Sequence, residues 1–205
     1  GMARDYFQRE NLIKGISEAS NEDLILISDL DEIPDLNQLD FQKVRNNIVI
    51  FEQKMFYYKL NLFYEDYIWQ GTKAVKRKNF ISPQWLRNIK GKKYSKWRLD
   101  TFFSKKKYSN LLFVKDGGWH FTCLRSPEEL EKKLLNFAHH YEFEESGLKL
   151  DDIKQLIKDK RVMYDHSVDQ KGYKWSGKSI LKNLDSKFLP DHVSSNLGKY
   201  SDWLD

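Results

Sequence analysis

A short apolar segment that runs directly into a group of carboxylates most constrains how this chain can fold. Residues 24–28 read LILIS, which suits a short buried strand. The next seven positions, DLDEIPD, hold four acidic residues: Asp29, Asp31, Glu32 and Asp35. Carboxylates this close repel one another, so they lie either in well-solvated loop or beside positive charge. Pro34 has no backbone N–H, so we expect it to stop strand pairing there.

Length and composition indicate a chain that forms one domain. With 205 residues, we expect a single domain over residues 2–205. Hydrophobic residues make up 40% of the chain and aromatic residues 15%, which is enough for a sizeable core. The single cysteine, Cys123, excludes an internal disulfide, and no stretch approaches the roughly 20 apolar residues of a membrane span. We therefore expect a cytoplasmic protein, or one held peripherally at a bacterial membrane.

The net charge of +5 is concentrated in three segments, at residues 73–78, 90–98 and 104–107. Such segments attract phosphates, anionic lipid or nucleic acid. They are equally typical of a solvated lysine-rich face. The sequence leaves both interpretations open.

Periodicity and propensity predict an alternating α/β domain. We expect helices at residues 3–19, 36–46, 126–142 and 149–160. We expect strands at residues 24–28, 47–64 (one long strand or a bent pair) and 68–76, and a strand–turn–strand hairpin at 111–124. The clearest signal is Ser126, a predicted N-cap followed by Pro127 and, three residues after the cap, Glu129.

The pair Asp29 and Asp31 has a chemical use at the end of a strand. A strand end directs the two carboxylates to one side, where Mg²⁺ or Mn²⁺ accepts oxygen ligands and bridges them to a diphosphate. An alternative is a capped turn, in which the carboxylates accept local backbone N–H groups. Another is a phosphatase like the haloacid dehalogenases, with Asp29 as nucleophile and Asp31 as acid. That chemistry requires a later acidic pair at a strand end, whereas Asp151–Asp152 begins a helical pattern.

Three motifs occur in order along the chain: ISDLDEIP (27–34), GGWHFTCL (117–124) and LLNFAHHYE (134–142). Together they resemble glycosyltransferase family 17, which includes the β-1,4-mannosyl-glycoprotein 4-β-N-acetylglucosaminyltransferases. The segment RDYFQRENLIKGI (4–16) is similar to the helix that precedes the acidic motif in that family. The similarity is weaker toward the C-terminus.

This resemblance implies a GT-A-like core, a nucleotide-sugar donor such as a UDP-sugar, a divalent metal and inversion at the anomeric carbon. The transferred sugar is then a hexose or N-acetylhexosamine, with GlcNAc favoured, and the acceptor is a glycan. Only residues 1–28 precede Asp29, so we expect much of the N-terminal nucleotide-binding half to be lacking. A missing N-terminal segment or a partner chain would supply it.

The predicted site residues follow from this chemistry. The metal ligands are Asp29, Asp31 and, by the resemblance, His139. The candidates for catalysis are His120, Asp116 and Glu32, since inversion needs a base at the acceptor hydroxyl. The candidates for substrate binding are Trp119, Gly118, Trp69, Arg87 and Glu142: Trp119 offers a face for a sugar ring, Gly118 a close backbone approach, and Arg87 a bidentate grip on phosphate.

A function from another class stays open. Residues 85–108 mix basic and aromatic side chains, which suits a non-catalytic module that binds nucleic acid or polysaccharide. Such a module would lose affinity steeply with salt and would need no metal.

Overall fold

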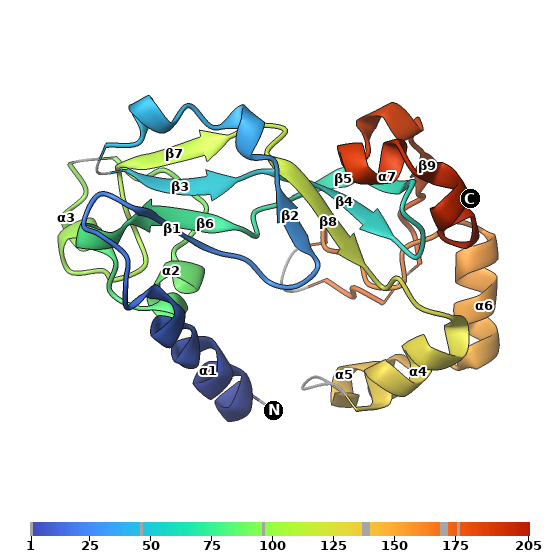
Figure 1. Cartoon of the computed structure of the whole chain (residues 1–205). Helices are drawn as coiled ribbons and strands as arrows, with labels where there is room; N and C mark the ends of the chain where they lie inside the picture. Colours follow the sequence, from blue (N-terminus) through green and yellow to red (C-terminus); the bar gives the residue numbers. More distant parts are fainter. Residues whose placement is uncertain (1, 46, 96, 137–139, 169–171, 176) are drawn as a thin grey trace. The chain divides into compact units, whose positions relative to one another are not determined.

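The computed structural model describes residues 2–45, 47–95, 97–136, 140–168, 172–175 and 177–205. Two compact units make up the chain: Gly1–Gln53 with Trp69–Gly118, and Lys54–Ile68 with Trp119–Asp205. Both units contain helices and strands, in agreement with the predicted α/β class (Figure 1). The single domain expected over residues 2–205 stays a prediction.

A four-stranded sheet forms the centre of the first unit (Figure 1). Its order is β1 (Leu24–Ile27), β6 (Lys73–Lys76), β3 (Ile48–Phe51) and β7 (Leu111–Val114). Strand β6 runs antiparallel to both β1 and β3, whereas β7 runs parallel to β3. The buried strand predicted before the acidic loop is therefore confirmed as β1.

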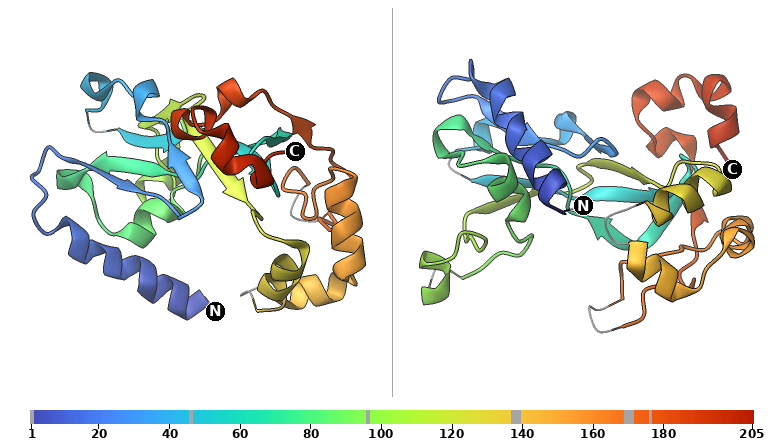
Figure 2. Two further views of the ribbon diagram at one scale, coloured as in Figure 1. Left: turned by 45° about the vertical axis from the view of Figure 1, so that its right-hand side comes forward. Right: turned by 90° about the horizontal axis from the view of Figure 1, so that it is seen from below.

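Short elements surround this sheet in the first unit. They are α1 (Met2–Glu10), η1 (Asn11–Ile16), β2 (Glu32–Pro34), η2 (Leu36–Gln38), η3 (Phe41–Lys43), η4 (Arg77–Asn79), α2 (Pro83–Asn88) and α3 (Leu99–Phe102), where η denotes a 3-10 helix. Helix α1 contacts α2, and α2 contacts β1 and β6 (Figure 2). Helix α2 therefore connects the N-terminal helix to the sheet.

Strand β3 is buried on both faces. Ile48 and Ile50 pack in one cluster with Leu86 of α2, whereas Val49 and Phe51 belong to a second cluster. Successive side chains on a strand point to opposite faces, so the continuous apolar run IVIF satisfies both clusters. This double burial fixes the register of the strands that carry the site.

A second sheet forms the centre of the second unit. Four neighbours lie there in the order β8 (Gly118–Thr122), β4 (Gln53–Tyr57), β5 (Leu62–Trp69) and β9 (Lys182–Asn183). Strand β8 is parallel to β4, and β9 is antiparallel to β5. The helices of this unit are α4 (Pro127–Leu135), α5 (His140–Ser146), α6 (Leu150–Lys158), η5 (Ser186–Phe188), α7 (Asp191–Ser194) and η6 (Leu197–Trp203).

The two faces of this second sheet have different coverings. Phe56 and Phe121 stack with ring centroids 5.1 Å apart, in a cluster with Leu189 of the C-terminal segment. On the other face, the Tyr57 hydroxyl donates to the carbonyl oxygen of Tyr164 at 3.0 Å. Helix α4 contacts both α5 and α6 in the same unit (Figure 2).

The strongest local signals in the sequence are confirmed. Ser126 caps α4: its hydroxyl accepts the N–H of Glu129 at 3.2 Å, and the Glu129 carboxylate accepts the N–H of Ser126 at 3.2 Å. The helix expected at 149–160 is present as α6. For residues 47–64 we expected one long strand or a bent pair. The pair is present as β3 and β4, which are separated at Glu52, but residues 62–64 begin a further strand, β5. Local hydrogen bonds can be read from sequence spacing alone, which explains these successes.

The predicted hairpin at 111–124 is wrong. Strand β7 pairs with β3, and β8 pairs with β4, both in parallel. The bend at Glu52 therefore recurs between β7 and β8: Glu52 donates to the carbonyl oxygen of Val114 at 2.9 Å and accepts from Gly117 at 2.8 Å. The segments β3–β4 and β7–β8 are interrupted at matching positions. Glycine occurs at such a bend as well as in a hairpin turn, so its presence in the sequence did not distinguish the two arrangements.

Other boundaries also differ from the sequence predictions. The helix expected at 3–19 is α-helical to Glu10 and then narrows into η1, and the one expected at 36–46 is the pair η2 and η3. Pro34 ends strand β2 rather than lying in a loop without pairing. Proline is tolerated at the end of a short strand because its missing N–H is not needed there for pairing.

Candidate functional site at the acidic loop

A tight turn follows β1 and carries the predicted acidic site. The N–H of Glu32 donates to the carbonyl oxygen of Asp29 at 3.0 Å, which closes the turn over residues 29–32. The Ser28 hydroxyl donates to the carbonyl oxygen of Glu32 at 3.2 Å and bonds the hydroxyl of Thr72. The start of the turn is thus fixed to the segment that leads into β6.

Glu32 is the interior anchor of this turn. Its side chain is 0% exposed. One carboxylate oxygen accepts from the Trp69 indole at 2.8 Å, and the other accepts from Arg87 at 3.0 Å and from the backbone N–H of Asp29 at 2.9 Å. Both oxygens are therefore engaged by donors within the first unit, so Glu32 is better placed to hold the loop than to take a proton. Its predicted catalytic role stays untested.

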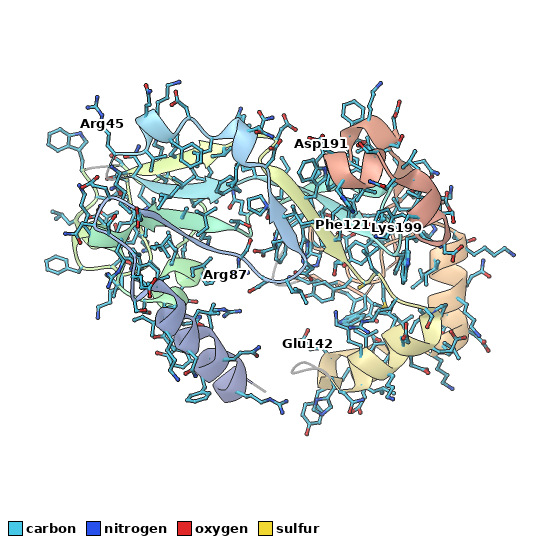
Figure 3. All side chains as sticks on the ribbon, in the orientation of Figure 1. Arg45, Arg87, Phe121, Glu142, Asp191 and Lys199 are labelled. Carbon is cyan, nitrogen blue, oxygen red and sulfur yellow. The ribbon has the colours of Figure 1, made fainter. Side chains whose placement is uncertain are left out.

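Arg87 neutralises the carboxylates that the sequence gathers. Its guanidinium donates to Asp29 at 2.6 Å, to Glu32 at 3.0 Å and to the carbonyl oxygen of Gly71 at 2.5 Å. A second guanidinium, that of Arg9 in α1, lies 3.5 Å from the other oxygen of Asp29. Arg87 projects from α2 (Figure 3) and is only 13% exposed. The repulsion within the acidic loop is thus offset by two arginines that are distant in sequence.

Trp69 and Gly71, two residues apart in the segment WQGT (69–72), belong to the same cluster as Glu32 and Arg87. The Trp69 indole is held by Glu32, as described above, and Gly71 packs directly against that hydrogen bond. A Cβ atom on Gly71 would lie 2.3 Å from Glu32 Oε1 and 2.3 Å from Trp69 Nε1. The glycine is therefore required by the packing of the chain itself.

We expect Gly71→Ala to destabilise the first unit by about 2 kcal/mol, because the added methyl group overpacks the Glu32–Trp69 contact. Urea unfolding followed by tryptophan fluorescence measures this loss. The matched control is Gly15→Ala, since a Cβ on Gly15 meets no atom within 4 Å. Equal unfolding midpoints for the two variants would contradict the tight packing at Gly71.

Lys73 is a buried charged group that the sequence analysis missed. It lies in the basic segment 73–78, but its ammonium group donates to the carbonyl oxygens of Arg87 at 2.7 Å and Ile89 at 2.5 Å. Burial and the charge of Arg87 lower the pKa of Lys73 to about 8, and Glu32 opposes that shift. The amine closes the C-terminal end of α2, which helps to hold Arg87 in place.

The donor set at the loop suits a metal that keeps other ligands. Asp29 is 40% exposed and Asp31 is half-buried, so both carboxylates lie at the surface. Within the described part of the chain, no group of three or more His, Cys, Asp or Glu side chains is placed to hold a metal ion. Mg²⁺ is commonly bound through one or two carboxylates together with water and substrate phosphates. Two aspartates match that pattern and do not form a closed cage.

Asp116 and Gly118 lie in the connection between β7 and β8. Asp116 is exposed and has a φ of 48°. Gly118 has a φ of 126°, and a Cβ there would lie 2.1 Å from the carbonyl oxygen of Ile33 and 2.7 Å from the N of Asp35. The close approach predicted for Gly118 is therefore made to the acidic segment of the chain itself. This contact places Gly118, near the start of the second motif, against the first motif.

Trp119 and His120 point to opposite faces of the second sheet. Trp119 packs in the cluster of Phe56 and Phe121, and its indole donates to the carbonyl oxygen of Phe188 at 2.7 Å. His120 is buried and pairs in register with Met55. Since side chains alternate along a strand, a ligand bound on one face of the sheet does not contact both Trp119 and His120. The adjacent positions of the two residues in a predicted strand already indicated this.

Glu142 is exposed on α5, in the second unit (Figure 3). His139, the predicted third metal ligand, lies outside the described residues. The structure thus gathers Asp29, Glu32, Trp69 and Arg87 in the first unit. It assigns Trp119, His120 and Glu142 to the second unit.

No helix in the described ranges has the length and apolar character that crossing a membrane requires. Comparison of the chain with protein-family models, with curated proteins and with solved structures found no significant match.

Proposed function

We propose that this protein is a metal-dependent, inverting glycosyltransferase with a GT-A-like core. It transfers a hexose or N-acetylhexosamine, with GlcNAc favoured, from a nucleotide-sugar to a glycan. One observation carries the proposal: the turn after β1 presents Asp29 and Asp31 at the surface while Glu32 and Arg87 fix it from inside. Two carboxylates on one turn at a strand end suit a metal that is also bound by a diphosphate.

Asp29 and Asp31 would hold Mn²⁺ or Mg²⁺. When bound, such an ion neutralises the charge that develops on the leaving diphosphate. Arg9 and Arg87 add positive charge beside Asp29, and guanidinium groups also suit phosphate oxygens. The two arginines that contact Asp29 would thus also favour the diphosphate that the metal binds.

His120 and Asp116 are the candidates for the base that activates the acceptor hydroxyl. His120 lies on the second sheet with Thr122 and Tyr57, on the face opposite Trp119. Asp116 is exposed in the turn before β8. Of the two, His120 is the better placed to exclude water, because it is buried.

We expect Asp31→Asn to weaken metal-dependent binding of UDP-GlcNAc. The change removes one anionic oxygen ligand and leaves the side chain nearly isosteric, so the ion loses affinity while the fold stays intact. Calorimetric titration of UDP-GlcNAc with and without Mn²⁺ measures the effect, and we expect a loss of about tenfold or more.

The control for this test is Glu18→Gln, which removes one negative charge at an exposed position of the same unit. Its titration should match that of the unchanged protein. Donor binding that ignores Mn²⁺, or that persists in Asp31→Asn, would overturn the metal site. Hydrolysis of a phosphate ester without any glycan, abolished by Asp29→Asn, would instead favour the phosphatase chemistry.

One observation favours a second candidate, a module that binds anionic polymers. Trp97 is 93% exposed and Phe103 is 90% exposed, in a segment with the exposed lysines Lys92, Lys93 and Lys105. Exposed aromatic rings between basic groups suit base stacking with phosphate contact. Binding of single-stranded nucleic acid that falls steeply with salt and ignores Mn²⁺ would favour this candidate.

A further inference from the structure

A cavity of about 300 Å³ lies within the second unit, apart from the acidic loop. Its walls come from the second sheet, from α4 and α5, and from the segment after α6. Aromatic side chains dominate these walls: Tyr57, Phe143, Tyr164, His166 and Trp175. A concave, largely aromatic pocket with a few polar groups is the usual form of a small-ligand site.

The aromatic walls are mutually braced. The ring centroids of Tyr164 and Trp175 are 5.1 Å apart and nearly perpendicular, and those of Phe143 and Trp175 are 5.6 Å apart. The Tyr57 hydroxyl bonds the backbone of Tyr164, as described above. Tyr57 and Phe143 are buried, whereas Tyr164 and Trp175 are partly exposed. The pocket therefore has an apolar interior and two partly exposed rings, and the Lys174 ammonium group lies over the Tyr164 ring, 5.4 Å from its centroid.

Charged groups of both signs lie at its mouth. Glu142 and Lys133 line the cavity, and both are exposed. Together with the neighbouring Thr122, they offer acceptors and donors to hydroxyl groups. A pyranose ring has apolar C–H faces and a periphery of hydroxyls, so it matches ring faces bordered by polar groups. The charges of Glu142 and Lys133 are opposite, so these two groups give a polyanion no net attraction to the cavity.

Trp175 also lines two adjoining hollows, each of about 540 Å³. The first shares Glu142 and Tyr164 with the cavity, and the second shares Tyr173 with the first. Three hollows that share Trp175 as a lining residue have room for more than one sugar ring. This extension points to an oligosaccharide rather than a single sugar.

We propose that the pocket centred on Trp175 binds a neutral oligosaccharide, with one pyranose ring against Trp175 and Tyr164. The inference deepens the proposed function and rests on it in one respect, because it assigns the pocket to the glycan that accepts the sugar. Glu142 then binds hydroxyl groups of that glycan, as the sequence predicted for a substrate-binding residue. Binding needs neither the metal nor the nucleotide-sugar.

The experiment is saturation-transfer NMR of the full chain with chitotriose, mannotriose and cellotriose, without donor and without metal. We expect at least one trisaccharide to bind, and Trp175→Ala to weaken that binding about tenfold or more. Trp175→Phe keeps a ring face and should retain part of the affinity, which guards against a fold lost in the alanine variant. Trp203→Ala is the control, since Trp203 is exposed in the same unit and lines none of these three hollows.

The outcomes separate this inference from the proposed function. No binding of any trisaccharide up to about 10 mM would overturn the inference, and so would binding that Trp175→Ala and Trp175→Phe leave unchanged. If trisaccharides bind as expected but Mn²⁺-dependent donor binding is absent, the pocket stands and the transferase proposal fails. If the Mn²⁺-dependent donor binds and no trisaccharide does, the transferase proposal stands and this inference fails.

Discussion

Replacing Arg87 with methionine is expected to lower the free energy of unfolding by about 3–5 kcal/mol, the usual cost of removing one partner of a buried ion pair. Glu32 would keep its charge at a fully buried position without the guanidinium that lies 3.0 Å away. Asp29 would lose its 2.6 Å contact at the same time. Urea unfolding measures the loss, and methionine retains much of the buried aliphatic volume of the arginine.

The matched control is Arg45→Met, because Arg45 is exposed in the same unit (Figure 3). We expect its free energy of unfolding to stay within about 0.5 kcal/mol of the unchanged protein. A double variant, Arg87→Met with Glu32→Gln, tests the cause directly. It should be less destabilised than the sum of its two single changes, because the neutral amide no longer leaves a buried charge. Strict additivity would contradict the proposed pairing.

The sequence left open whether solvent or positive charge offsets the acidic loop, and it did not identify the arginines that do so. Arg87 lies 55 positions from Glu32, and Arg9 lies 20 positions before Asp29. Such contacts depend on how α1 and α2 pack on the sheet, which no local pattern specifies. Arg87 was instead predicted to bind phosphate, a role that its contacts with Asp29 and Glu32 leave to be tested.

Local patterns predicted well wherever the deciding hydrogen bonds are local. The cap of α4 joins Ser126 and Glu129, three residues apart, and the strand before Asp29 follows from a run of apolar residues. The parallel pairing of β7 with β3 depends on residues about 60 positions apart, so a turn with glycine was mistaken for a hairpin. Lys73 was assigned to a basic segment that either binds anions or is solvated, because nothing nearby in the sequence shows that its ammonium group donates to two backbone carbonyl oxygens.

Acidification from pH 6.5 to pH 4 is expected to lower the free energy of unfolding by about 3 kcal/mol through His166 alone. Burial first, and then the neighbouring His120 and Lys174, lower the pKa of His166 from 6.5 to about 4, while Asp165 opposes the shift. The rings of Tyr67 and Tyr164 also lie against it, at centroid distances of 5.3 and 4.9 Å. Between these two pH values the unfolded chain binds a proton at this position and the folded chain does not, so stability falls as pH falls.

A second loss should follow at lower pH from Asp165. Burial acts to raise its pKa, but hydrogen bonds from Ser167, Tyr64 and Ser179 hold the pKa at about 2, below its ordinary 3.8. The Tyr64 and Ser179 hydroxyls donate to it at 2.6 and 2.7 Å. A lowered carboxyl pKa contributes stability that is present above pH 3.8 and is lost as the pH falls toward 2. The two groups therefore act in successive pH ranges, which allows them to be separated.

Urea unfolding of His166→Gln at a series of pH values isolates the histidine, because glutamine stays polar and does not titrate. Between pH 6.5 and pH 4, we expect the free energy of unfolding of this variant to fall by about 3 kcal/mol less than that of the unchanged protein. Below pH 4, the two proteins should lose stability equally. His192→Gln makes the same change at an exposed position of α7 and should reproduce the unchanged pH profile. If both variants and the unchanged protein lose stability in parallel from pH 6.5 to 4, then His166 titrates alike in the folded and unfolded chains, and its burial against the aromatic wall does not govern the acid response.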